Sequence, residues 1–252
     1  MPVQNPKYSF QPKQKTVNNT TKCMALLLMI VFVWFVASCS SLSKAGGDIQ
    51  GKIVYEISYP YEAKSVMMDL YPKEMTVTFK DNKLHSSIKS EYDMLTTDFI
   101  VDNTQKEFAQ LLKNMSKRSA MKMNKDETKR WFDTMPGYRL EKTNETKLIC
   151  GYKCYKTIAH PTDASKPKID IYATRTIGLD NSNWWNPYQS LDGFMMAYDI
   201  EQYGICMRMC AKRVSFENID PAEFDVPQTY TMTDARTMQG LLTEVVETYV
   251  KR

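Results

Sequence analysis

Hydrophobic and polar side chains alternate along most of the chain from Gly51 onward. Ile53, Tyr55 and Ile57 fall on one face of the first such segment, and Glu56 falls on the other. This period of two predicts a β-strand with one buried face. The same alternation recurs over residues 75–80, 84–88, 95–101, 138–147, 148–160, 168–174, 194–202 and 205–214. Short polar turns such as Asp81-Asn82 join the segments, so the pattern predicts one antiparallel sheet, strongly curved or partly closed.

Two segments have helical spacing instead. In residues 124–135, Trp131, Phe132 and Met135 share one face. In residues 233–250 the apolar stripe consists of Met238, Leu241, Leu242, Val245, Val246 and Tyr249. Each stripe needs an apolar surface to cover it, and the concave face of the sheet is the best candidate. The expected fold class is therefore mainly β, a half-open β-barrel closed by a mid-chain helix and a C-terminal helix.

Residues 104–117 also carry helical signals. Thr104 and Glu107 have the spacing of a capping box, and the apolar residues Phe108, Leu111 and Leu112 follow at helical intervals. By themselves these signals predict a helix.

The N-terminal region has the features of an export signal. Residues 1–22 are polar with four lysines and no acidic residue, and residues 24–36 form the unbroken apolar run MALLLMIVFVWFV. A helix that spans a membrane needs about 20 apolar residues, and this run is shorter. Residues 1–38 are therefore predicted to be a signal peptide rather than a transmembrane anchor. The sequence from Val36 to Cys39 resembles a bacterial lipobox, in which the cysteine is acylated and becomes the first residue.

These features predict a location and a domain organisation. Residues 39–50 are small and polar, as in a flexible tether, and residues 51–252 are expected to form one domain. Acyl chains such as palmitate on Cys39 would anchor the protein in a membrane. Ser40 is not the aspartate that retains some lipoproteins at the inner membrane, which favours the periplasmic face of the outer membrane. Surface exposure stays open.

Removal of the leader also changes the charge. The chain has 33 basic and 29 acidic side chains, and the leader accounts for four of the basic ones. The remaining chain is formally neutral, so it has no excess of positive charge that would attract nucleic acid.

Four cysteines form two CxxxC units, Cys150 with Cys154 and Cys206 with Cys210. On a strand the members of each unit would be about 13 Å apart, too far for a bridge within the unit. If the two strands are antiparallel neighbours, Cys150 faces Cys210 and Cys154 faces Cys206, and two disulfides would join them. We favour disulfides over unpaired thiols, a zinc or copper site and a redox centre; no metal or cofactor is expected.

Catalytic patterns are absent from the sequence. It has two histidines, no P-loop and no dinucleotide fingerprint, so an enzyme is not expected. The chain is instead rich in methionine, and Met195, Met207 and Met209 are candidates to line an apolar cavity, although ordinary core packing is the favoured interpretation. A polar loop contains Trp184, Trp185 and Tyr188, which either contact a lipid or protein or fold back onto the sheet.

The C-terminal third resembles the closing motif of LolA/LolB-like lipoproteins of unknown function. The matching positions are Gly193, Tyr203-Gly204, Lys212-Arg213, Asp220-Pro221, Phe224, Pro227 and Tyr230. Upstream, GKIVYEISYP resembles the opening strand of that family and ICGYKCYKTI its central strand. The resemblance spans residues 51–230 and implies a half-open β-barrel. It also implies a hairpin over residues 105–123, which we prefer to the helix. The four internal cysteines and the C-terminal helix are departures from the family.

Two functions remain. As a non-catalytic binding module, the half-barrel would hold an acyl chain, a lipid or an apolar peptide. As an interaction lipoprotein with a packed interior, it would contact an envelope protein through its sheet edge and the Trp-rich loop. An enclosed apolar void of about 300 Å³ or more would favour the first function, and a filled interior would favour the second.

Overall fold

A computed structural model describes residues 49–60, 71–90, 93–202 and 205–249. The predicted signal peptide and Cys39 lie outside the described residues, as do Tyr203 and Gly204 of the family motif. The described part belongs to one compact unit, Asp48–Arg252.

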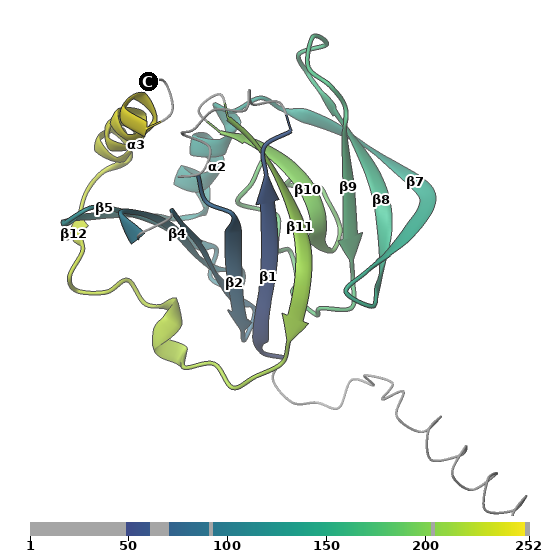
Figure 1. Ribbon diagram of the computed structural model, residues 1–252, viewed down its shortest axis with the longest axis horizontal. Helices are drawn as coiled ribbons and strands as arrows, with labels where there is room; N and C mark the ends of the chain where they lie inside the picture. The colour runs from purple at the N-terminus through teal and green to yellow at the C-terminus, as the bar shows by residue number, and fades with distance from the viewer. Residues whose placement is uncertain (1–48, 61–70, 91–92, 203–204, 250–252) are drawn as a thin grey trace, which may run out of the picture. The chain divides into compact units, whose positions relative to one another are not determined.

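The described residues form a single 12-stranded sheet. The strands are β1 (Gly51–Ser58), β2 (Glu74–Lys80), β3 (Lys83–Lys89), β4 (Leu95–Asp102), β5 (Glu107–Asn114), β6 (Lys117–Met123), β7 (Tyr138–Ile149), β8 (Tyr152–Pro161), β9 (Ile169–Thr174), β10 (Phe194–Gln202), β11 (Ile205–Ser215) and β12 (Thr231–Met232). Their order is β12-β6-β5-β4-β3-β2-β1-β11-β10-β9-β8-β7. All neighbours are antiparallel except β12, which runs parallel to β6. Figure 1 shows the sheet curving without closing, which confirms the predicted fold class.

The concave face of the sheet carries the main core. Ile53, Tyr55 and Ile57 of β1 are buried there, as their alternation predicts. The pairing of β1 with β11 is interrupted by a bulge between Val54 and Tyr55, and similar irregularities interrupt the β9–β10 and β7–β8 pairs. Bulges bend a strand and increase its twist, so they help the long sheet to curve around its core.

Both predicted helices are present. Helix α2 (Lys125–Asp133) begins after Asn124, whose side chain accepts from the backbone N–H of Glu127, while the Glu127 carboxylate accepts from the Asn124 N–H. This reciprocal capping box fixes the start of the helix. Helix α3 (Ala235–Tyr249) buries Met238 and Leu242 in the main core. Neither helix in the described part of the chain has the length and apolar character needed to cross a bilayer.

The helix predicted from the spacing of residues 104–117 is wrong, and the hairpin implied by the family resemblance is correct. Strands β5 and β6 pair from Phe108 opposite Met123 to Asn114 opposite Lys117. Strand β5 is buried on both faces: Phe108 and Leu112 belong to the main core, whereas Ala109 and Leu111 belong to a second cluster. A strand covered on both faces has a continuous apolar run, and such a run also contains apolar residues at the intervals of a helix.

The second cluster is covered by the segment between β11 and β12, which we call the strap (residues 216–230). The strap contains the short 3-10 helix η3 (Pro221–Phe224), and Ile219 and Phe224 are buried against Ala109 and Leu111. The Lys80 ammonium donates a hydrogen bond to the Ile219 carbonyl at 2.8 Å. Figure 1 shows the strap as the yellow-green loop that leads to β12. Phe224 and Tyr230, two of the positions that resemble the family motif, thus pack against the sheet.

Candidate functional site

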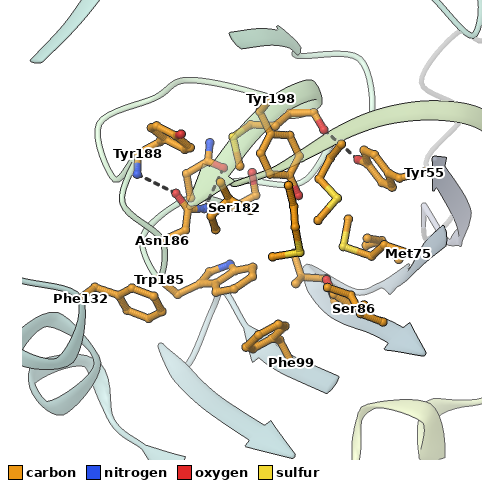
Figure 2. Close-up of a pocket in the computed structure, with 18 of the residues that line it drawn as sticks. Tyr55, Met75, Ser86, Phe99, Phe132, Ser182, Trp185, Asn186, Tyr188 and Tyr198 are labelled. Atoms are coloured by element: carbon orange, nitrogen blue, oxygen red, sulfur yellow. Dashed lines mark hydrogen bonds between the residues drawn. The ribbon is translucent and has the colours of Figure 1, made fainter. Parts of the chain in front are cut away.

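An apolar cavity of about 80 Å³, partly open to solvent, lies on the concave side of the sheet. Its walls come from β1 to β5, from β10 and β11, from α2, and from the loop between β9 and β10. Figure 2 shows these side chains converging from opposite parts of the curved sheet. Residues far apart in the sequence therefore build one site, which the sheet and α2 enclose.

Methionines form much of the cavity wall. Met195, Met207 and Met209, which the sequence singled out, all line it, together with Met75 of β2. The Tyr55 hydroxyl donates to the Met195 carbonyl at 2.8 Å and so links β1 to β10 across the intervening β11. Burial raises the pKa of the Tyr55 hydroxyl well above its ordinary value, so it stays protonated and keeps this hydrogen bond at neutral pH.

The aromatic residues of the β9–β10 loop turn inward. The Trp185 ring lies over Phe99 and Phe108, with ring centroids 5.8 and 5.7 Å apart. Tyr188 is buried and donates its hydroxyl to the carbonyl of Asp199, and both Trp185 and Tyr188 line the cavity. The loop therefore folds back against the sheet, one of the two arrangements expected from the sequence.

Trp184, unlike Trp185, does not line the cavity. Its indole N–H donates to the Asn103 side-chain oxygen at 3.0 Å. The structure thus brings five of the six candidate contact residues to one cavity and leaves Trp184 outside it.

Two asparagines hold the loop in this conformation. Asn183 donates to the carbonyls of Leu191 and Gly193 at 3.0 and 2.8 Å, and Asn186 accepts the Tyr188 N–H at 2.8 Å. Gly193 has φ +94°, and a Cβ there would lie 2.8 Å from the Thr174 carbonyl oxygen, so this position requires glycine. Sequence reasoning did not identify the asparagines. Their placement among aromatic residues was the available signal.

Three polar atoms of the cavity wall are buried without a hydrogen-bond partner among the described residues. They are the Gln110 amide nitrogen, the Ser182 hydroxyl and the Trp185 indole nitrogen. Each such group costs about 1–3 kcal/mol when left unpaired. Sequence reasoning missed Gln110 and Ser182, although a glutamine inside the apolar run FAQLL is itself unusual.

The cysteines do not have the predicted register. Cys150 lies in the two-residue turn between β7 and β8, with φ +51°, rather than on a strand, and β8 is separated from β11 by β9 and β10. The curvature of the sheet nevertheless brings Cys150 to β11, where the Cys150 and Cys210 thiols lie 3.3 and 4.0 Å from the same Ala211 carbonyl oxygen. The two sulfur atoms are therefore no farther apart than the sum of these distances. The disulfides remain a prediction, no longer supported by strand pairing.

Alkylation distinguishes the states of these thiols. Burial raises the pKa of the Cys154 thiol to about 11, and its side chain is fully buried. Only the thiolate reacts, so at pH 8 iodoacetamide should modify Cys154 about 100-fold more slowly in the folded chain than in urea, and more rapidly as the pH approaches 11. Peptide mass spectrometry measures the rates. Equal rates in both states contradict the burial; no labelling in urea until a reductant is added shows a disulfide.

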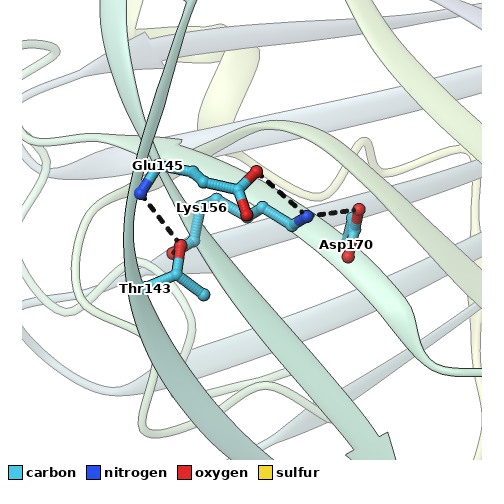
Figure 3. A network of polar contacts seen from close by, with 4 residues as sticks. All are labelled: Thr143, Glu145, Lys156 and Asp170. Carbon is cyan, nitrogen blue, oxygen red and sulfur yellow. Dashed lines mark hydrogen bonds and ion pairs between the residues drawn. The ribbon is translucent and has the colours of Figure 1, made fainter.

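A charged cluster spans β7, β8 and β9 at one edge of the sheet. The Lys156 ammonium lies 3.2 Å from the Glu145 carboxylate and 2.9 Å from that of Asp170, as Figure 3 shows. Hydrogen bonds to Asp170 and Glu145 raise the pKa of Lys156. The Thr143 hydroxyl donates to the Lys156 carbonyl at 3.1 Å within the β7–β8 irregularity. Charges and a bulge of this kind protect an edge strand from pairing with other chains.

Comparison with known proteins adds little to this description. No family model and no curated protein matches the chain. Among solved structures, PNGF-II in its C2 crystal form matches with 15% identity and a TM-score of 0.49, over 77% of this chain and 32% of that chain. The P21 form of PNGF-II matches with 16% identity and the same TM-score, over 76% of this chain and 32% of that chain. A β-barrel-like protein of the domain of unknown function DUF1849 from Brucella abortus matches with 6% identity and a TM-score of 0.30, over 68% of this chain and 98% of that chain. The chain thus spans about a third of PNGF-II. Its own sheet order and curvature define a mainly β, open, barrel-like domain.

Proposed function

We propose that this protein is a non-catalytic, membrane-anchored binding module that holds a hydrophobic ligand on the concave side of its sheet. The cavity is the observation that carries this proposal. Its wall is apolar apart from a few polar groups, and it includes Met75, Met195, Met207 and Met209. Methionine side chains are flexible and polarizable, which suits a surface that adapts to an apolar guest. The resemblance to LolA/LolB-like lipoproteins, with their half-open barrels, agrees with this function.

The size of the cavity restricts the ligand. About 80 Å³ is below the about 300 Å³ of enclosed void that would by itself favour a binding module over an interaction protein, and below the 300–1,000 Å³ of pockets that enclose drug-sized molecules. The ligand is therefore a small apolar molecule, or the apolar end of a larger one such as a lipid. A whole acyl chain would require the methionines to move aside.

Native mass spectrometry of the purified full-length chain tests this proposal. We expect an apolar molecule to remain bound to the wild type and to Val54→Leu, and to be lost from Val77→Leu. Val77 lines the cavity, so an added methylene occupies its space, whereas Val54 is buried but is not among the lining residues. If the wild type carries no ligand, or if both variants retain it, the proposal fails.

The alternative function is that of an interaction lipoprotein that contacts an envelope protein. The orientation of the loop counts against it, because Trp185 and Tyr188 face the cavity and Tyr188 is 1% exposed. Absence of a bound molecule in the same mass spectra, together with a co-purifying envelope protein, would favour this alternative.

Anchoring at the periplasmic face of the outer membrane is part of the proposal. Substitution of Cys39 tests whether this residue carries the lipid anchor. Cys39→Ser should abolish incorporation of labelled palmitate and leave the leader uncleaved, because the leader is cleaved only after the sulfur of this cysteine has been acylated. Cys23→Ser, within the leader, is the matched control and should leave both unchanged. Palmitate incorporation into Cys39→Ser at the wild-type level contradicts the assignment.

A further inference from the structure

The unpaired polar atoms of the cavity provide information on the ligand's chemistry. Gln110 is 1% and Ser182 5% exposed, and neither the Gln110 amide nitrogen nor the Ser182 hydroxyl has a hydrogen-bond partner among the described residues; the same holds for the Trp185 indole nitrogen. Buried polar side chains are normally paired, so three unpaired ones in the wall of one cavity require a partner.

The fold places these three groups in the wall of the same cavity. Gln110 is directly opposite Phe99 in the β4–β5 register, and Phe108 precedes it by two residues on the same face of β5. The Trp185 ring packs on both phenylalanines and therefore lies over the face of the β4–β5 pair that carries Gln110. Ser182 precedes Trp185 by three residues in the same loop, and Figure 2 shows the two on one side of the cavity.

All three groups can donate a hydrogen bond, and an indole N–H can only donate. The carboxylate in the wall, Glu201, already accepts from the Lys166 ammonium at 2.6 Å. The cavity therefore presents donors without a free positive charge. An anionic ligand would leave water for an apolar site with no cation available to pair with it, which is unfavourable.

Building on the proposed function, we infer that the ligand has an apolar body and one neutral carbonyl oxygen, whose two lone pairs accept hydrogen bonds from the Gln110 and Trp185 side chains. The competing explanation is ordered water. A cavity of about 80 Å³ has room for more than one water molecule, which would satisfy the donors and give an acceptor-bearing ligand no advantage.

A pair of isosteric probes separates these explanations. Acetophenone has the acceptor oxygen, and α-methylstyrene has a methylene in its place. Binding to the full-length chain in lipid nanodiscs is followed through the ¹³C-methyl resonances of Met195 and Met209, with each affinity referred to the free aqueous probe concentration. We expect acetophenone to bind about tenfold more tightly, and Gln110→Met and Trp185→Phe each to reduce this preference.

Trp184→Phe is the matched control, because its indole N–H is already bonded to Asn103 outside the cavity wall. It should retain the full preference for acetophenone. Equal affinities for the two probes, or a preference that survives both Gln110→Met and Trp185→Phe, would overturn the inference and leave the proposed function intact. Binding of neither probe at the methionines would contradict the proposed function itself.

Discussion

Phe108→Ala is expected to lower the free energy of unfolding by about 4 kcal/mol. Phe108 is 1% exposed, and its ring lies 5.7 Å from the centroids of both Phe132 and Trp185 and 6.1 Å from that of Phe99. Truncating a buried phenylalanine costs about 3–5 kcal/mol, including the cavity that it leaves. The substitution also removes the aromatic contacts that hold α2 and the β9–β10 loop on the sheet.

Urea denaturation followed by circular dichroism measures this effect as a lower midpoint with an unchanged slope. Leu148→Ala is the control, because Leu148 is 71% exposed and its truncation should change stability by less than about 0.5 kcal/mol. A loss below about 1 kcal/mol for Phe108→Ala would show that β5, α2 and the loop do not share one core.

Arg208→Met should have the second-largest effect, a loss of about 2–3 kcal/mol. Asp199 is 6% exposed, and Arg208 binds both of its carboxylate oxygens through Nε and Nη2, each at 2.8 Å. Methionine preserves much of the packing but leaves the buried carboxylate without its cation, which is strongly unfavourable. The expected value lies below that of a fully buried pair, since half of the Arg208 side chain is exposed.

Arg175→Met is the matched control for the same denaturation experiment. Arg175 and Asp192 form a 2.6 Å pair in which both side chains are more than half exposed, so its loss should cost less than about 1 kcal/mol. Adding Asp199→Asn to Arg208→Met should recover part of the lost stability, because it removes the uncompensated charge. Equal effects of Arg208→Met and Arg175→Met would contradict the burial of Asp199.

Alternation predicted most of the sheet because most strands have one face on the core. It failed at β5 and β6. On β5 the strap covers Ala109 and Leu111 of the outer face, so this face lacks the polar residues that would mark a strand. It also placed the β7–β8 turn too early. The turn falls at Cys150-Gly151, both with positive φ, and cysteine is not a residue that signals such a turn.

The candidate site was predictable in composition but not in arrangement. The methionines and the aromatic loop were evident in the sequence, yet their orientation depends on contacts between distant segments. Trp185 is placed by Phe99 and Phe108, and the loop is closed by Asn183 bonding to Leu191 and Gly193. Such contacts have no local period, so no sequence pattern reports them. For the same reason the proximity of Cys150 to β11 follows from the sheet's curvature and not from strand register.

Xenon binding tests the central claim most directly, because an apolar cavity that can hold a guest takes up xenon. With the full-length chain freed of its bound molecule and placed in nanodiscs under xenon pressure, the ¹³C-methyl resonances of Met195 and Met209, which line the cavity, should shift and saturate, and Val77→Leu should weaken the effect. The exposed Met115, 60% accessible to solvent, should show no saturable change. If the cavity methionines respond no differently from Met115, the concave side has no space that an apolar guest can enter, and the protein is not the hydrophobic-ligand binder proposed for it.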